Sequence, residues 1–328
     1  MLVSMSHASS TSIGVSWAVL ATALWGATFL GPAAVAPVGP IYLVFGRYFV
    51  FGAISAVVVV VMRKRVRTLG ARRVLIAVHL GIVGYVGFYL FFSFAAELGG
   101  GALASIITGV MPAAVTIASN LVKRQIAWRA LATPIGLTCA GLVALNLRLP
   151  LTESSTGQFI ATTGFALLAC ALWSYFVVVN GLVLKAATGP RIDNTTWTAL
   201  IGTGALIGSF ALLPIAWVSG STSPTVDHMT FVRFAVVSVL LAAAGSWCAS
   251  WSWNRATARI STVILGQLMA LETLFGGLFN LLWDQRWPTL HELIGAALVT
   301  VGVITCVRAL EAKSAASMKP PMSEESKT

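Results

Sequence analysis

Apolar segments of about 20 residues follow one another along almost the whole chain, and they restrict its fold more than any other feature. A transmembrane helix needs about 20 mostly apolar residues, so each segment is long enough to cross a bilayer. We therefore predict an all-α integral membrane protein with about ten transmembrane helices. The expected spans are 15–36, 40–62, 73–96, 99–122, 129–148, 158–184, 194–218, 231–254, 258–282 and 289–309.

The composition agrees with a membrane location. Of the 328 residues, 57% are hydrophobic and 9% are charged, whereas a soluble domain typically has about 25% charged residues. The chain therefore lacks the polar surface that would keep it in water. All four cysteines fall within the expected spans, so we expect buried thiols and no disulfides.

The net charge of +11 would suggest nucleic acid as the partner of a soluble protein, but its distribution argues otherwise. If the ten spans are real, the loop 62–73, every second loop after it and the C-terminal tail lie on one side of the membrane. Most of the 21 Lys and Arg residues are in these segments. The opposite side has only Arg148, Arg233 and Arg286. This asymmetry satisfies the positive-inside rule if both termini are cytoplasmic. We therefore exclude nucleic acid and expect a lipid bilayer, the cytoplasmic (inner) membrane of a bacterium.

The two halves of the chain resemble each other. ALWG at 23–26 corresponds to ALWS at 171–174, and the segments 102–122 and 259–279 have a similar layout. A repeat of five spans is odd in number, so the second copy must cross the membrane in the opposite direction, as in many secondary transporters. Chance likeness between helices rich in small residues is the alternative. The expected parts are a tail at 1–14, a first five-helix repeat at 15–148, a linker at 149–157, a second repeat at 158–310 and a disordered tail at 311–328.

Four stretches together resemble a known family. They are ALWGATF (23–29), GPIYLVFGRYFVFGAI (39–54), YLFFSFAAELGGGALASIITGVMPAAVT (89–116) and SWSWNRATARISTVILGQLMALETLF (250–275). In order and spacing they resemble the drug/metabolite transporter superfamily, in its ten-helix form of two EamA-type repeats. Members often have Leu-Glu-Pro in span 9, whereas Thr273 replaces the proline here. Within the superfamily the chain most resembles the YddG-type exporters of aromatic amino acids, which implies a transporter and not an enzyme.

Two charged residues inside the spans are candidate substrate contacts. Glu272 matches the glutamate of the family's Leu-Glu-Pro pattern and lies near the middle of its span. An intramembrane carboxylate can hold an ammonium group or carry a proton, or it can lock two helices together. Arg47 is about 10 Å from the outer end of span 2, where it could hold a substrate carboxylate, extend to the interface or serve the packing of helices. A zwitterion would use both residues.

Aromatic residues supply the other candidates for a central cavity. Trp25 and Trp173 occupy matching places in the two repeats, while Tyr85 with Tyr89 and Trp247 with Trp251 are each four apart on repeat-related spans. Gln267 could add a hydrogen-bonding group. Ordinary packing is the alternative for all of these. Six other tryptophans fall near span ends, where an interfacial belt explains them: Trp17, Trp128, Trp197, Trp217, Trp283 and Trp287.

The leading functional hypothesis is secondary export of amino acids, preferably aromatic or hydrophobic ones, by alternating access. An exporter of cationic drugs or other metabolites would use the same carboxylate and tryptophans. The chain has no HExxH, GxSxG or Walker A motif, so we expect no enzymatic activity, no ATP-driven pumping, no metal and no cofactor. A channel is a further alternative that saturable, competable flux would exclude.

Overall fold

The computed structural model describes residues 2–36, 38–146, 155–187, 189–218 and 227–317. All regular structure in these ranges is helical, which confirms the all-α prediction. The expected linker at 149–157 and the end of the tail lie largely outside them. Residues 2–14 and 311–317 are helical, because α1 begins at Leu2 and α16 extends to Ser317, so both helices run into the expected tails.

The first half of the chain forms helices up to residue 146. These are α1 (Leu2–Ala27), the 3₁₀ turn η1 (Thr28–Leu30), α2 (Gly31–Val35), α3 (Pro40–Val61), α4 (Arg63–Leu69), α5 (Ala71–Gly81), the π-helix η2 (Ile82–Gly87), α6 (Phe88–Thr108), α7 (Met111–Val122) and α8 (Trp128–Asn146). Pro40 and Pro112 lie in the first turns of α3 and α7, where a missing N–H costs nothing.

The second half begins with α9 (Thr156–Leu184), whose first turn Ser155 and Gln158 close as a capping box. It continues with α10 (Asn194–Ser209), α11 (Leu212–Val218), α12 (His228–Leu240), the π-helix η3 (Leu241–Cys248), α13 (Ala249–Thr257), α14 (Thr262–Leu268), α15 (Ala270–Trp283) and α16. Asp193, Asp227 and Ser261 cap α10, α12 and α14 through their side-chain oxygens.

Nine helical stretches of the described residues are long and apolar enough to cross a membrane, and α7 is a shorter apolar helix. The sequence predicts a separate span at 99–122, with a tight turn at the glycine run 99–101 and a bend at Pro112. The structure differs there, because α6 continues through these glycines to Thr108. The helix is interrupted only after Thr108, just before α7 begins at Met111. Pro112 explains the position of the break, since it favours the start of a new helix.

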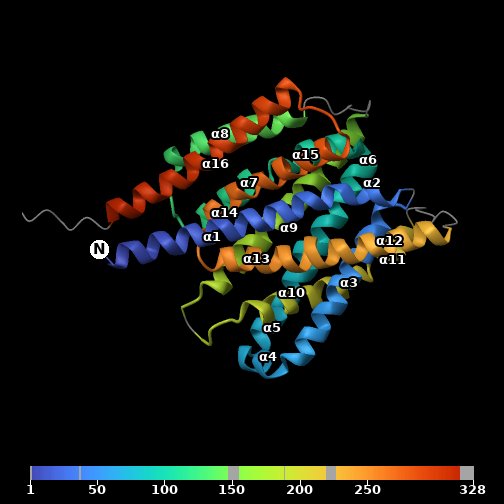
Figure 1. Ribbon diagram of the computed structural model, residues 1–328, viewed down its shortest axis with the longest axis horizontal. Helices are drawn as coiled ribbons and strands as arrows, with labels where there is room; N and C mark the ends of the chain where they lie inside the picture. Colours follow the sequence, from blue (N-terminus) through green and yellow to red (C-terminus); the bar gives the residue numbers. More distant parts are fainter. Residues whose placement is uncertain (1, 37, 147–154, 188, 219–226, 318–328) are drawn as a thin grey trace, which may run out of the picture.

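Helices of the first half pack along helices of the second half. The pairs are α8 with α16, α6 with α9, α3 with α10, α1 with α13, and α7 with α14. Figure 1 shows α8 alongside α16 and α1 running between α13 and the α14–α15 segment. The hydrophobic core therefore lies at the boundary between the halves, where Trp25, Tyr85 and Trp173 belong to one buried cluster.

Candidate functional site

A cavity of about 780 Å³ lies at this boundary, within the size range of small-molecule sites. Its walls come from both halves, since α1, α3, α6 and α8 line it together with α9, α15 and α16. Six of the candidates from the sequence line it: Trp25, Arg47, Tyr85, Tyr89, Trp173 and Glu272. The structure thus brings both charged candidates and four aromatic candidates to one place.

Trp173 is the centre of the aromatic part of this cavity. Its ring contacts Trp25 edge to face at a centroid distance of 5.7 Å, and it also contacts Tyr85 at 6.0 Å and Phe88 at 5.4 Å. The indole Nε1 of Trp173 donates a hydrogen bond of 3.4 Å to the Met269 Sδ atom. Trp25 and Trp173 are 5% and 7% exposed, so they form a wall that is packed from behind.

Tyr85 lies on the π-helix η2, and its ring contacts Tyr48 at 6.0 Å. The Tyr85 hydroxyl shares a hydrogen bond with the Ser250 hydroxyl on α13. A buried phenol needs such a partner, and this one holds the ring against the second half of the protein. Tyr89 lines the cavity one turn further along the same helical segment.

Arg47 reaches from α3 to the second π-helix, η3. Its Nε donates to the Ser246 Oγ at 2.8 Å, and its Nη2 donates to the Gly245 carbonyl oxygen at 2.7 Å. The guanidinium carbon is 5.6 Å from the centre of the Tyr48 ring. Arg47 is therefore anchored inside the protein and does not need to extend to the interface.

Glu272 lies in the first turn of α15 and is partly exposed to the cavity. Among the described residues, its carboxylate has no hydrogen bond and no ion pair within 4.0 Å, although the charge of Arg47 acts on it. Gly26 makes this position possible: a Cβ there would come within 2.9 Å of the Glu272 backbone oxygen and 2.7 Å of the Gly276 nitrogen. The glycine lets α1 approach α15 beside the carboxylate.

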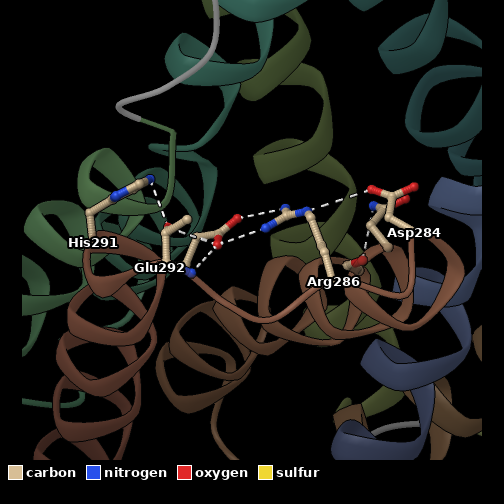
Figure 2. A network of polar contacts seen from close by, with 7 residues as sticks. Asp284, Arg286, His291 and Glu292 are labelled. Atoms are coloured by element: carbon tan, nitrogen blue, oxygen red, sulfur yellow. Dashed lines mark hydrogen bonds and ion pairs between the residues drawn. The ribbon is translucent and has the colours of Figure 1, made fainter.

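A polar network joins α15 to α16 at one edge of the cavity (Figure 2). Glu292 accepts two hydrogen bonds from Arg286, at 2.8 and 3.0 Å, and two from the backbone nitrogen and hydroxyl of Thr289. The Asp284 Oδ2 atom lies 3.7 Å from Arg286 Nε, and His291 Nε2 shares a hydrogen bond with the Thr289 hydroxyl. This network holds the loop between α15 and α16. Glu292 also lines the cavity, so the loop lies at the edge of the cavity.

Three candidates from the sequence do not line this cavity. Trp247 packs against Phe51, and Trp251 packs against Trp17 and beneath the Arg255 guanidinium. Gln267 is fully buried between Thr138 and Thr116, whose hydroxyls share hydrogen bonds with its amide. The four-residue spacing predicts only that the two tryptophans lie near one face of the helix, and the neighbours of that face are Phe51 and Trp17, not the cavity.

The belt interpretation is wrong for Trp197. This residue is fully buried, and its Nε1 donates to the Asn180 Oδ1 at 2.7 Å. Asn180 in turn donates to Asn254, and Asn254 donates to Thr198, so the indole belongs to a buried polar network. Trp287 is 91% exposed, and the Trp217 side chain lies outside the part of the chain that the structure describes.

Sequence reasoning did not select several residues that the structure places at this site. Tyr48, Phe88 and Met269 line the cavity, and Trp253 packs against Trp25 from behind at 5.1 Å. Tyr48 follows Arg47 directly, so the arginine–aromatic pair was the available signal. No group of three or more His, Cys, Asp and Glu side chains in the described ranges is placed to hold a metal ion.

Helices long and apolar enough to span a membrane thus surround a cavity of a size suited to a small molecule, as in carriers of small molecules. The chain belongs to the EamA-like transporter family, whose profile matches it twice, at residues 12–147 and 162–308. It is therefore a membrane transporter of the drug/metabolite transporter superfamily.

Individual proteins agree with this assignment. The chain is 30% identical over 310 residues to the inner membrane protein YtfF of Escherichia coli (strain K12), which covers 90% of this chain and 95% of YtfF. A solved crystal structure superposes with a TM-score of 0.72 at 17% identity, over 93% of this chain and 99% of the other. At that identity the likeness shows the fold alone.

Proposed function

We propose that this transporter exports amino acids, preferably aromatic or other hydrophobic ones, from the bacterial cytoplasm. The observation that carries the proposal is the composition of one cavity, which holds a cation, a carboxylate and a wall of aromatic rings. A free amino acid has the complementary parts: a carboxylate, an ammonium group and a side chain.

Each part of the substrate has a partner in this proposal. The carboxylate binds the Arg47 guanidinium, because Nη1 has no hydrogen bond to any described residue and charged hydrogen bonds are strong. The ammonium group binds Glu272, whose carboxylate has no ion pair in the described structure. The substrate side chain contacts Trp25, Tyr85 and Trp173, where an aromatic ring gains from stacked or edge-to-face contact.

Transport proceeds by alternating access between two inverted five-helix repeats, with the substrate near the midplane. The double match of the family profile and the packing of helices across the two halves support the repeat. The π-helices η2 and η3 occur in repeat-related spans, which also fits this plan.

The proposed location is the inner membrane, with both termini in the cytoplasm. The likeness to the inner membrane protein YtfF supports this location, and the strongly basic segment at 62–73 supports this orientation.

Flux measurements with the purified protein in liposomes test the proposal. Labelled phenylalanine is loaded, and its efflux is followed with unlabelled tryptophan or the lipophilic cation tetraphenylphosphonium as a competitor. The proposal predicts saturable phenylalanine flux that tryptophan blocks and the cation does not. Absence of amino-acid flux together with saturable flux of the cation would instead identify a cation exporter, which would use Glu272 and the same rings.

A further inference from the structure

Arg47 is held in place by a second residue that has no access to the cavity. Ser246 is fully buried on η3 and accepts the hydrogen bond from Arg47 Nε, while the adjacent Gly245 carbonyl accepts from Nη2. Together these two acceptors fix one edge of the planar guanidinium. An arginine has five N–H donors, so the Nη1 edge is left for a ligand.

The backbone around this contact is built for close approach. A Cβ at Gly46 would come within 2.6 Å of the Ser238 Oγ, so the glycine lets α3 lie against α12. A Cβ at Gly245 would overlap the Thr28 Cγ2, so this glycine lets η3 lie against the end of α1. Gly46 and Gly245, the residues that precede Arg47 and Ser246, thus allow their segments to pack closely. The guanidinium therefore has a defined position beside the cavity.

We infer that Ser246 is a positioning residue that gives the transporter its preference for substrates with a carboxylate. The Ser246 hydroxyl and the Gly245 carbonyl orient Arg47, and Arg47 then presents Nη1 to the substrate carboxylate. A fixed guanidinium loses less conformational entropy on binding than a mobile one. This inference rests on the proposed function, because it assigns the recognition of one end of an amino acid.

The test compares three ligands that share a phenyl ring and differ in their polar ends. Phenylalanine has both charged groups, 3-phenylpropionate has only the carboxylate and phenethylamine has only the amine. In liposomes containing Ser246→Ala protein, KM for phenylalanine should rise roughly tenfold, as expected when a hydrogen bond to a charged group is lost, with an unchanged maximal rate. The inhibition constant of 3-phenylpropionate should rise in parallel, and that of phenethylamine should not change.

Two further variants separate positioning from packing. Ser246→Cys keeps a side chain of similar size with a weaker acceptor, so its KM should lie between those of wild type and Ser246→Ala. Ser119→Ala is the matched control, because Ser119 is also a buried serine, it lies on α7 without lining the cavity, and its Oγ has no hydrogen-bond partner among the described residues. It should behave as wild type.

The possible contrary outcomes are distinct. An unchanged KM in Ser246→Ala, or an equal loss of affinity for phenethylamine, would overturn the positioning role while leaving amino-acid transport intact. Wild-type protein that binds phenethylamine as tightly as phenylalanine would overturn carboxylate recognition. Wild-type protein that transports no amino acid would reject the proposed function, and this inference with it.

Discussion

Trp25 and Trp173, which occupy matching positions in the two halves of the sequence, contact each other edge to face at a centroid distance of 5.7 Å. Trp25 comes from α1 and Trp173 from α9, and both line the cavity. The contact joins the first helices of the two family matches at the place where we propose that the substrate ring binds.

Replacing Trp173 should destabilise the protein strongly. Trp173→Ala removes the contacts with Trp25, Tyr85 and Phe88 and should cost about 3–5 kcal/mol, whereas Trp173→Phe should cost less because a ring remains. Thermal unfolding of the detergent-solubilised variants tests whether Trp173→Ala is less stable than Trp173→Phe. Trp287→Ala is the control, since that side chain is 91% exposed and should have little effect. Equal stability of Trp173→Ala and the control would contradict a packed aromatic wall.

The buried network of Asn180, Trp197 and Asn254 should behave as one unit. Asn254→Leu leaves the Asn180 amide without its acceptor and should cost about 1–3 kcal/mol. The double variant Asn180→Leu/Asn254→Leu should cost less than the two single costs added together, because the pair shares a hydrogen bond. Denaturation of the four proteins gives the coupling energy, and strictly additive costs would show that the network is not coupled.

Asp193 should make stability depend on pH. Burial raises the pKa of this carboxyl, but hydrogen bonds from Thr196 and the nearby Arg65 outweigh it, so the pKa lies below its ordinary value. The stabilising effect is therefore present above the unfolded pKa of about 3.9 and is lost as pH falls through the lower folded pKa. Asp193→Asn should be less stable than wild type at neutral pH, and the gap should close in acid. A gap that is the same at every pH would exclude the carboxylate charge as its cause.

The network in Figure 2 should control the loop between α15 and α16 more than global stability. Glu292→Gln weakens the paired hydrogen bonds with Arg286, which is 44% exposed, so we expect a loss of at most about 1 kcal/mol. Amide hydrogen exchange across residues 284–290 should nevertheless become faster, because local opening requires less free energy than global unfolding. Unchanged exchange in this loop would show that the ion pair does not hold it.

The sequence predicted the class of fold well and individual contacts less well. Long apolar segments can satisfy their backbone groups in a bilayer only as helices or closed barrels, so hydropathy alone indicated most of the spans. Glu272, Arg47, Trp25 and Trp173 stood out because they broke a pattern or repeated one. The sequence suggested all four for a central cavity, but their proximity did not follow from spacing, because it depends on how two distant halves pack.

The errors have local physical causes. The spacing of Trp247 and Trp251 predicts a shared helix face but not what that face contacts, and the two rings pack against Phe51 and Trp17 instead of lining the cavity. The position of Trp197 near a span end predicts a place in the interfacial belt, but a hydrogen bond from its indole to Asn180 allows the side chain to be buried. The glycines at 99–101 indicated a turn, yet the helix continues through them until Pro112 favours a new start.

The central claim is that Glu272 binds the amino group of a transported amino acid. It is tested most directly by phenylalanine counterflow in liposomes that contain equal amounts of wild type, Glu272→Gln or Glu97→Gln, the last being an exposed glutamate of α6. The account predicts saturable counterflow for wild type and Glu97→Gln, and loss of it for a folded Glu272→Gln. Counterflow at the wild-type rate and KM in Glu272→Gln would contradict the claim and leave Glu272 with a role in packing only.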